Sequence, residues 1–178
     1  MDSINRNQQE EHIDNLQGTE AVKKLRDLCE KAKNCFFCTS ISSSGPFNTR
    51  PMAVQKIDED GTCWFLSAVD SIKNKEVLAD PYIQLLFQAS THSGFVSLSG
   101  RAEISTDKLK IKELWEPLLK TWFTEGLDDP RISVIKFVPH SGYYWDTKNG
   151  QIVAFAKQVT GALIGKTMDD SIEGSLNL

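Results

Sequence analysis

The chain has 178 residues, of which 40% are hydrophobic and 25% are charged, with a formal net charge of −4. This length predicts one domain, and the acidic balance argues against a nucleic-acid-binding protein, which normally carries a strong basic excess. No apolar run approaches the roughly 20 residues of a membrane-spanning helix. The polar first fifteen residues lack the apolar core of a signal peptide. We therefore expect a cytoplasmic protein with no membrane or nucleic-acid partner.

Hydrophobic periodicity predicts mostly strands with three helices inserted among them. The helical segments cover residues 19–34, 72–80 and 106–122, and the last should kink or restart at Pro117. The strand-like segments cover residues 35–42, 47–57, 62–67, 81–89, 94–105, 131–138 and 141–146. Residues 150–163 fit either a helix or an irregular strand, and from Lys166 onwards a surface tail is expected.

Short links between the strands, such as the hairpin signal at residues 58–61, predict antiparallel pairing. About six paired strands predict a closed barrel or a sandwich. We expect a central domain over residues 19–163, a mobile tail over 1–18 and a C-terminal tail over 164–178.

The four cysteines are Cys29, Cys35, Cys38 and Cys63. Cys35 and Cys38 have the spacing of a redox or zinc motif. However, they lie in a predicted strand, where residues three apart point to opposite faces. No second Cys or His pair has zinc spacing. The pattern favours buried structural thiols and no metal site.

No side chain is convincingly catalytic. The three histidines are His12, His92 and His140, and none stands in a recognisable catalytic pattern. No serine lies in a nucleophile elbow. If the protein is an enzyme, a cofactor is therefore expected to carry the chemistry.

The strand around Arg50 indicates an anion site or an ordinary surface arginine. Alternation puts Arg50, Met52 and Val54 on one face, and Pro51, which has no N–H to donate, indicates an edge strand or a bulge. An arginine among apolar neighbours needs an anionic partner such as a phosphate or carboxylate.

The start of the helix at residues 72–80 also supports two interpretations. Ser71 precedes this helix, and Lys73 lies in its first turn. Ser71 fits a helix cap. Free N–H groups at a helix start, together with a lysine, also fit an anion site. Taken alone, the pattern leaves both interpretations open.

Taken together, these segments resemble one known family. The stretches TRPM, DEDGTCWFLSAVDSIKNKEVLADPYIQLLFQ, FVSLSGRAEI and LWEPLLKTWFTEGLDDPRISVIKFVPHSGYYWD are similar, in order and spacing, to the general stress protein branch of the pyridoxamine 5′-phosphate oxidase-like flavoproteins. The resemblance covers about residues 20–150. It implies a mainly β (α+β) fold, a six-stranded antiparallel split β-barrel with short flanking helices, that forms a homodimer with FMN at the subunit interface.

The resemblance also implies roles for individual residues. It implies that Arg50, Ser71 and Lys73 hold the FMN phosphate. Gln88 would lie near the flavin ring, and Trp122 would reach it from the partner subunit. The residues implied to line the ring and ribityl chain are Pro51, Met52, Val54, Phe65, Leu66 and Ser67.

The implied function is that of an FMN-dependent oxidoreductase using NAD(P)H or another small-molecule substrate. A non-catalytic flavin protein, such as a reservoir or redox sensor, and an interaction module without flavin stay open as alternatives. The end of the chain, GKTMDDSIEGSLNL, lacks the Arg and His residues that bind the vitamer phosphate in true pyridoxamine phosphate oxidases. Vitamin B6 synthesis is therefore not expected.

Overall fold

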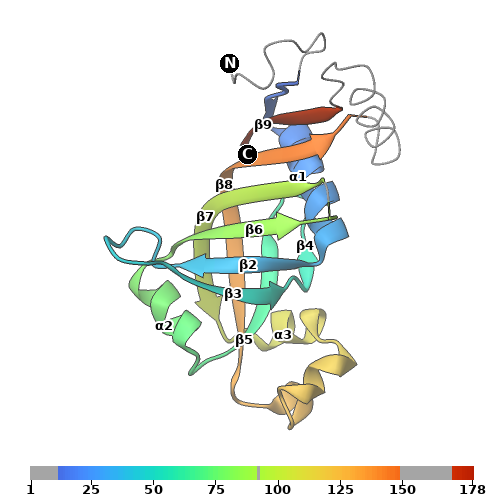
Figure 1. Cartoon of the computed structure of the whole chain (residues 1–178). Coiled ribbons are helices and arrows are strands. Elements are labelled where there is room, and N and C mark those ends of the chain that lie inside the picture. The colour runs from blue at the N-terminus through green and yellow to red at the C-terminus, as the bar shows by residue number, and fades with distance from the viewer. Residues whose placement is uncertain (1–11, 92, 149–169) are drawn as a thin grey trace.

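The structure is a computed structural model that describes residues 12–91, 93–148 and 170–178 (Figure 1). The described residues form a mixed sheet of nine strands with three α-helices and two 3-10 helices. The helices are α1 (Thr19–Ala32), α2 (Ile72–Ala79), α3 (Lys108–Leu114), η2 (Pro117–Thr121) and η3 (Gly126–Asp128). The strands are β1 (Leu16–Gln17), β2 (Asn34–Thr39), β3 (Asn48–Ala53), β4 (Lys56–Ile57), β5 (Cys63–Ala68), β6 (Tyr82–Gln88), β7 (Phe95–Ser105), β8 (Ile132–Thr147) and β9 (Ser171–Asn177).

The sheet is built around the long strand β8. The strand order is β1-β9-β8-β7-β6-β2-β3, and β5 pairs with both β8 and β4. The pair of β1 and β9 is parallel, whereas the other pairs are antiparallel, so the sheet is mixed and not wholly antiparallel as predicted. The hydrogen-bonded path is open at β3, from which the chain continues through Val54 and Gln55 into β4.

Two segments near the C-terminus differ from the prediction. The two strands expected at 131–138 and 141–146 form one strand, β8, whose register against β7 shifts between Ser99 and Gly100. This shift places Pro139 beside a bulge, where a residue without an N–H costs no ladder hydrogen bond. The expected surface tail contains β9, which fills the sheet edge beside β8 and buries Leu176.

The helix expected from Thr106 to Trp122 is shorter than predicted. α3 is capped by the Asp107 side chain and ends at Leu114, and the 3-10 helix η2 begins at Pro117. Proline lacks the N–H that helix continuation needs but suits a helix start. The expected restart at Pro117 is confirmed. The undecided segment 150–163 and residues 1–11 of the predicted N-terminal tail lie outside the described residues, as does His92.

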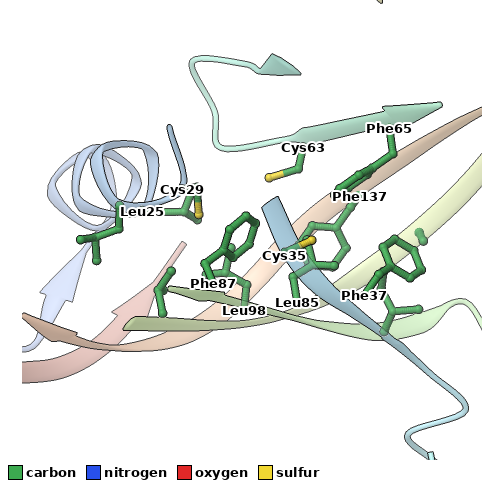
Figure 2. Packing of buried hydrophobic residues seen from close by; sticks show 14 of the residues in the cluster. Leu25, Cys29, Cys35, Phe37, Cys63, Phe65, Leu85, Phe87, Leu98 and Phe137 are labelled. Atoms are coloured by element: carbon green, nitrogen blue, oxygen red, sulfur yellow. The ribbon is translucent and has the colours of Figure 1, made fainter. Parts of the chain in front are cut away.

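The main core fills the space between α1 and the strands (Figure 2). Phe37 and Phe65 meet there edge to face, with ring centroids 5.4 Å apart. All four cysteines are free and buried, as expected for structural thiols. Burial raises the pKa of the Cys63 thiol to about 12 and also raises that of Cys35. These thiols therefore stay protonated and unreactive at neutral pH.

A second, smaller hydrophobic cluster lies at the other end of the molecule, under α3, η2 and η3 (Figure 1). It contains Leu66 of β5, Ile111 and Leu114 of α3, and Phe123. The Lys110 ammonium lies 4.1 Å from the Trp64 ring centroid and so fastens α3 to β5. Within the described residues, no helix is both long and apolar enough to cross a membrane.

Candidate cofactor site

A cavity of about 400 Å³ lies where β3, β5 and the segment after η2 meet. Its size falls within the roughly 300–1,000 Å³ typical of small-molecule pockets. It lies along β3, the last strand in the hydrogen-bonded path, so one edge of that strand faces no further strand. Its described lining residues are Pro51, Met52, Ala53, Gln55, Leu66, Ser67, Ala68, Lys73, Leu119, Trp122, Phe123 and Arg131.

Many of the sequence-predicted residues meet in this cavity, although they come from four separate segments. They are Pro51, Met52, Leu66, Ser67, Lys73 and Trp122. The Trp122 side chain is 63% exposed and borders the cavity of its own chain. The cavity therefore combines an apolar wall with a large, incompletely covered aromatic side chain.

A buried polar network fixes the start of α2 beside the cavity. Ser71 caps α2 by accepting a hydrogen bond from the Asn74 N–H. Its hydroxyl lies 3.1 Å from that of Ser67, and Ser67 donates to the Asn74 side-chain oxygen at 2.8 Å. The Asn74 amide in turn donates to Ser133 on β8. Ser71 is thus a helix cap, and the network holds its hydroxyl and the first turn of α2 in place.

Lys73 is a half-buried cation at the cavity wall. None of the carboxylates in the described parts of the chain forms an ion pair with Lys73. Burial lowers the pKa of Lys73, and the nearby positive charge of Arg50 lowers it further. An anion in the cavity would relieve both effects, because it would supply the missing opposite charge.

Arg50, in contrast, has a counter-ion and does not line the cavity. Its guanidinium donates to Glu76 at 2.8 Å and to the Thr39 hydroxyl at 3.1 Å. Glu76 also accepts from Thr39 at 2.6 Å and from Asn48 at 2.7 Å. We call Thr39, Asn48, Arg50 and Glu76 the β3–α2 junction, because they tie these two elements together.

The remaining predicted residues lie away from the cavity wall. Phe65 packs on Phe37 in the main core and is fully buried, so its side chain faces away from the cavity. Val54 packs against the same core. Gln88 is exposed at the end of β6, where its amide donates to the Ser90 carbonyl. Within this chain, the fold does not bring these three side chains to the cavity.

The structure adds Arg131 to the cavity, a residue that sequence reasoning missed. Its guanidinium donates to the two carboxylate oxygens of Asp129 at 2.9 and 2.7 Å. Asp129 is fully buried, and the hydrogen bonds from Arg131 lower the pKa of Asp129 to about 2.

The local sequence around Arg131 did not reveal this role, because the acidic and proline residues before it indicate only a turn. Its location depends on the pairing of β8 with β5, which the local sequence does not specify. The other lining residues missed by sequence reasoning are Ala53, Gln55, Ala68, Leu119 and Phe123.

The described cavity wall contains no carboxylate, imidazole or thiol. The lining residues include no His, Cys, Asp or Glu. Within the described residues, no group of three or more such side chains is arranged to hold a metal ion. The chemistry of this wall is therefore suited to binding an apolar molecule with an anionic end.

Comparison with known proteins assigns the chain to a family. The family model described as "Pyridoxamine 5′-phosphate oxidase like" matches residues 20–169. The chain belongs to the pyridoxamine 5′-phosphate oxidase-like family. The resemblance noted from the sequence motifs is thereby confirmed.

The chain is similar to a curated fungal protein and to several solved structures with general stress protein names. The chain is 26% identical over 154 residues to Protein bli-3 of Neurospora crassa, covering 82% of this chain and 74% of that protein. A putative general stress protein 26 from Jannaschia sp. CCS1 superposes with a TM-score of 0.73 and 25% identity, covering 90% of this chain and all of that one. The general stress FMN/FAD binding protein of Xanthomonas citri superposes with a TM-score of 0.58 at 21% identity, covering 68% and 85% of the two chains.

The residues of this member of the oxidase-like family are compatible with a flavin cofactor. A flavin needs a flat apolar surface, hydrogen-bonding partners at its edge and a charge partner for its phosphate. Met52 and Leu66 supply apolar surface, and Ser67 supplies a hydroxyl. Lys73 supplies a cation that lacks an ion-pair partner among the described residues. The charge left uncompensated at Lys73 is the observation that decides the fit.

Proposed function

We propose that this protein binds FMN in the cavity and works as an FMN-dependent oxidoreductase of the general stress protein type. The observation that carries the proposal is Lys73, a cation with no ion-pair partner among the described residues, at the wall of an otherwise mostly apolar cavity. Family membership and the flavin-binding relative from Xanthomonas citri support the same cofactor. When bound, FMN would supply hydride transfer between a reduced donor such as NAD(P)H and an acceptor.

In this proposal the chain's residues bind and orient the cofactor. Lys73 and the Ser71 hydroxyl would hold the phosphate at the start of α2, where N–H groups favour anions. Arg50 would attract the phosphate through its positive charge, and the ion pair with Glu76 would hold the Arg50 guanidinium in position. Met52 and Leu66 would lie against the ring.

We further propose that a second copy of the chain completes the site. Phe36 on β2 is 55% exposed and lies opposite Pro51, which also lines the cavity. Phe36 and Pro51 therefore form an exposed apolar patch that adjoins the cavity through Pro51, and exposed aromatic residues favour interface cores. We expect Phe36→Glu to produce monomers and to weaken FMN binding. Leu109→Glu, at an exposed position of α3, should do neither. Sedimentation analysis of both variants checks this, and a Phe36→Glu dimer with normal FMN affinity would contradict it.

The six strands β2, β3–β4, β5, β8, β7 and β6 would form a split barrel in this proposal. Support comes from the continuous passage of β3 into β4, which pairs with β5. The Gln55 N–H also donates to the Trp64 carbonyl at 2.8 Å, between the end of β3 and β5.

A flavin protein without turnover is the second candidate function. It is favoured by one observation, the lack of His, Cys, Asp or Glu among the described lining residues. Such a protein would store flavin or sense its redox state. Repeated cycles of flavin reduction and reoxidation with a defined acceptor would exclude this candidate.

Vitamin B6 synthesis is not part of the proposal. The C-terminal strand β9 pairs with residues 141–147 of β8, whereas β5, which lines the cavity, pairs with residues 132–137. Within one chain, the described residues of β9 therefore pair with the end of β8 that lies away from β5 (Figure 1).

The direct test is the absorption spectrum of the purified protein, followed by mass spectrometry of the released ligand. We expect flavin bands and the mass of FMN, and reduction of the bound flavin under anaerobic NADH or NADPH. A colourless protein that also binds no added FMN would refute flavin binding. Bound FMN that neither nucleotide reduces, and that turns over with no acceptor, would favour the second candidate.

A further inference from the structure

The charged residues of the cavity wall point to a dianionic ligand end. Among the described lining residues, only Lys73 and Arg131 are charged, and both are cationic. A phosphate monoester carries close to two negative charges at neutral pH. Two cationic side chains offer a phosphate more hydrogen-bond donors than Lys73 alone, even though Arg131 also pairs with Asp129.

Arg131 and Lys73 both lie beside the turn that joins β5 to α2. The Arg131 carbonyl accepts a hydrogen bond from the Val69 N–H at 2.8 Å. Val69 begins the turn that leads from β5 to Ser71, the cap of α2. Gln55, next to β4, lies near Trp64 further back along β5. Along β5, the two cationic lining residues therefore lie toward the start of α2, whereas the uncharged Gln55 lies toward β4.

The Arg131 guanidinium is held in a fixed orientation. Nε and Nη2 donate to the buried Asp129 carboxylate, and Nη2 lies 3.4 Å from the Trp122 carbonyl. The remaining terminal nitrogen, Nη1, has no hydrogen bond within the described residues. An arginine fixed along one edge can present its other donors to an anion without losing further side-chain freedom.

Arg50 differs in the use of its donors. Its two terminal nitrogens donate to Thr39 and Glu76, and it lies outside the cavity lining. Each of the two arginines pairs with one carboxylate, Arg50 with Glu76 and Arg131 with Asp129, but only Arg131 lines the cavity. Arg131 is therefore better placed for a direct contact with a ligand in this cavity.

We propose that Arg131 is a second cationic ligand of the cofactor phosphate, acting together with Lys73 at the start of α2. The inference rests on the proposed function, since it assigns the phosphate end of the same flavin site. In this arrangement Asp129 is a positioning residue: it orients the guanidinium but does not meet the phosphate.

Paired titrations of FMN and riboflavin test the role of Arg131, because riboflavin has the same ring without the phosphate. We expect Arg131→Met to weaken FMN binding by roughly 10- to 100-fold, the effect of losing a charge-assisted hydrogen bond. Riboflavin affinity should change less than about twofold, since the lost contact is to the phosphate. Arg101→Met, at an exposed position of β7, is the matched control and should change neither affinity.

Arg131→Lys separates the effect of the positive charge from the effect of the two hydrogen bonds to Asp129. A lysine keeps the positive charge but cannot form the two-pronged contact with a carboxylate. We expect it to retain most of the preference for FMN over riboflavin. Equal losses of FMN and riboflavin affinity in Arg131→Met would overturn the inference, because they would show a merely structural role.

The outcomes also separate this inference from the proposed function. A wild-type protein that binds neither flavin refutes the proposed function itself. A wild-type protein that prefers FMN, with an unchanged preference in Arg131→Met, refutes only the role of Arg131.

Discussion

The β3–α2 junction neutralises its positive charge, whereas the cavity beside it contains Lys73, a cation with no ion-pair partner among the described residues. In the junction, the Glu76 carboxylate accepts hydrogen bonds from Thr39, Asn48 and Arg50 at 2.6–2.8 Å. One turn earlier on the same helix, Lys73 has no ion pair within the described residues. The two regions share a helix and yet have opposite electrostatic arrangements.

The difference teaches how to separate folding from binding in this protein. A charge whose partners are all present contributes to the stability of the fold. A half-buried charge without a partner makes the empty protein less stable and is explained by a ligand that supplies the partner. We therefore expect substitutions in the junction to change stability and substitutions in the cavity to change cofactor affinity.

The largest effect on stability is expected from Glu76→Gln. It removes the charge that Arg50 pairs with, so the free energy of unfolding should fall by roughly 1.5–3 kcal/mol. FMN affinity should not fall, because the positive charge of Arg50 then lacks its Glu76 partner and still favours a nearby phosphate. Urea unfolding and FMN titration measure the two quantities, with the exposed Glu103→Gln on β7 as control. A large loss of FMN affinity with unchanged stability would contradict the assignment of the junction to folding and of the cavity to binding.

Acid should destabilise the junction in a defined pH range. Burial raises the pKa of Glu76, but hydrogen bonds from Thr39 and Arg50 outweigh burial and lower the pKa below its ordinary 4.5. A carboxylate with a lowered folded-state pKa contributes stability above its unfolded pKa and loses it as the pH falls through the folded pKa. The wild type should therefore lose more stability than Glu76→Gln below about pH 4.5. If the free energy of unfolding of the two proteins falls equally with pH, the ionised Glu76 does not stabilise the junction.

Trp122→Ala should have a moderate effect, confined to binding. The side chain borders the cavity but is largely exposed, so little packing is lost in the unliganded protein. We expect FMN affinity to fall by about 0.5–1.5 kcal/mol, the usual contribution of an aromatic contact. Leu118→Ala, at an exposed neighbouring position outside the cavity lining, is the control. Identical titration curves for the two variants would remove Trp122 from the site.

The smallest expected effect is a gain in stability of cofactor-free Lys73→Met. The pKa of Lys73 is lowered, chiefly by burial and also by Arg50, so its charged form is disfavoured in the folded state. This cost applies below the unfolded pKa of lysine and disappears as the pH rises above it. Removing the charge should therefore raise the melting temperature slightly at pH 7. Addition of FMN should stabilise the wild type much more than the variant.

Local patterns predicted much of the fold because they depend on neighbouring residues. The cap at Ser71, the restart at Pro117 and the hairpin before Cys63 follow from short-range chemistry. The strand β9 was missed because Ser171–Asn177 is polar and pairs with residues 141–147, far away in the sequence. Long-range pairing of this kind leaves little local signal.

Cavity residues were predicted where they belong to recognisable motifs. Residues that only the folded chain brings to the cavity were missed. Lys73 and Met52 were found through the resemblance, and both line the cavity. Phe65 was assigned to the same surface as Leu66, yet adjacent strand residues point to opposite faces. Arg131 was missed because only the ladder between β5 and β8 brings it to the cavity.

The most direct test of the central claim is a fluorescence titration of FMN into two lysine variants of α2. Lys73→Met removes the cavity cation that has no ion-pair partner in the described parts of the chain, and Lys75→Met removes an exposed cation two residues later. We predict that Lys73→Met binds FMN roughly 10- to 100-fold more weakly than the wild type. Lys75→Met should stay within about twofold. Equal FMN affinities for the two folded variants would contradict the assignment of the unpaired charge to the cofactor phosphate.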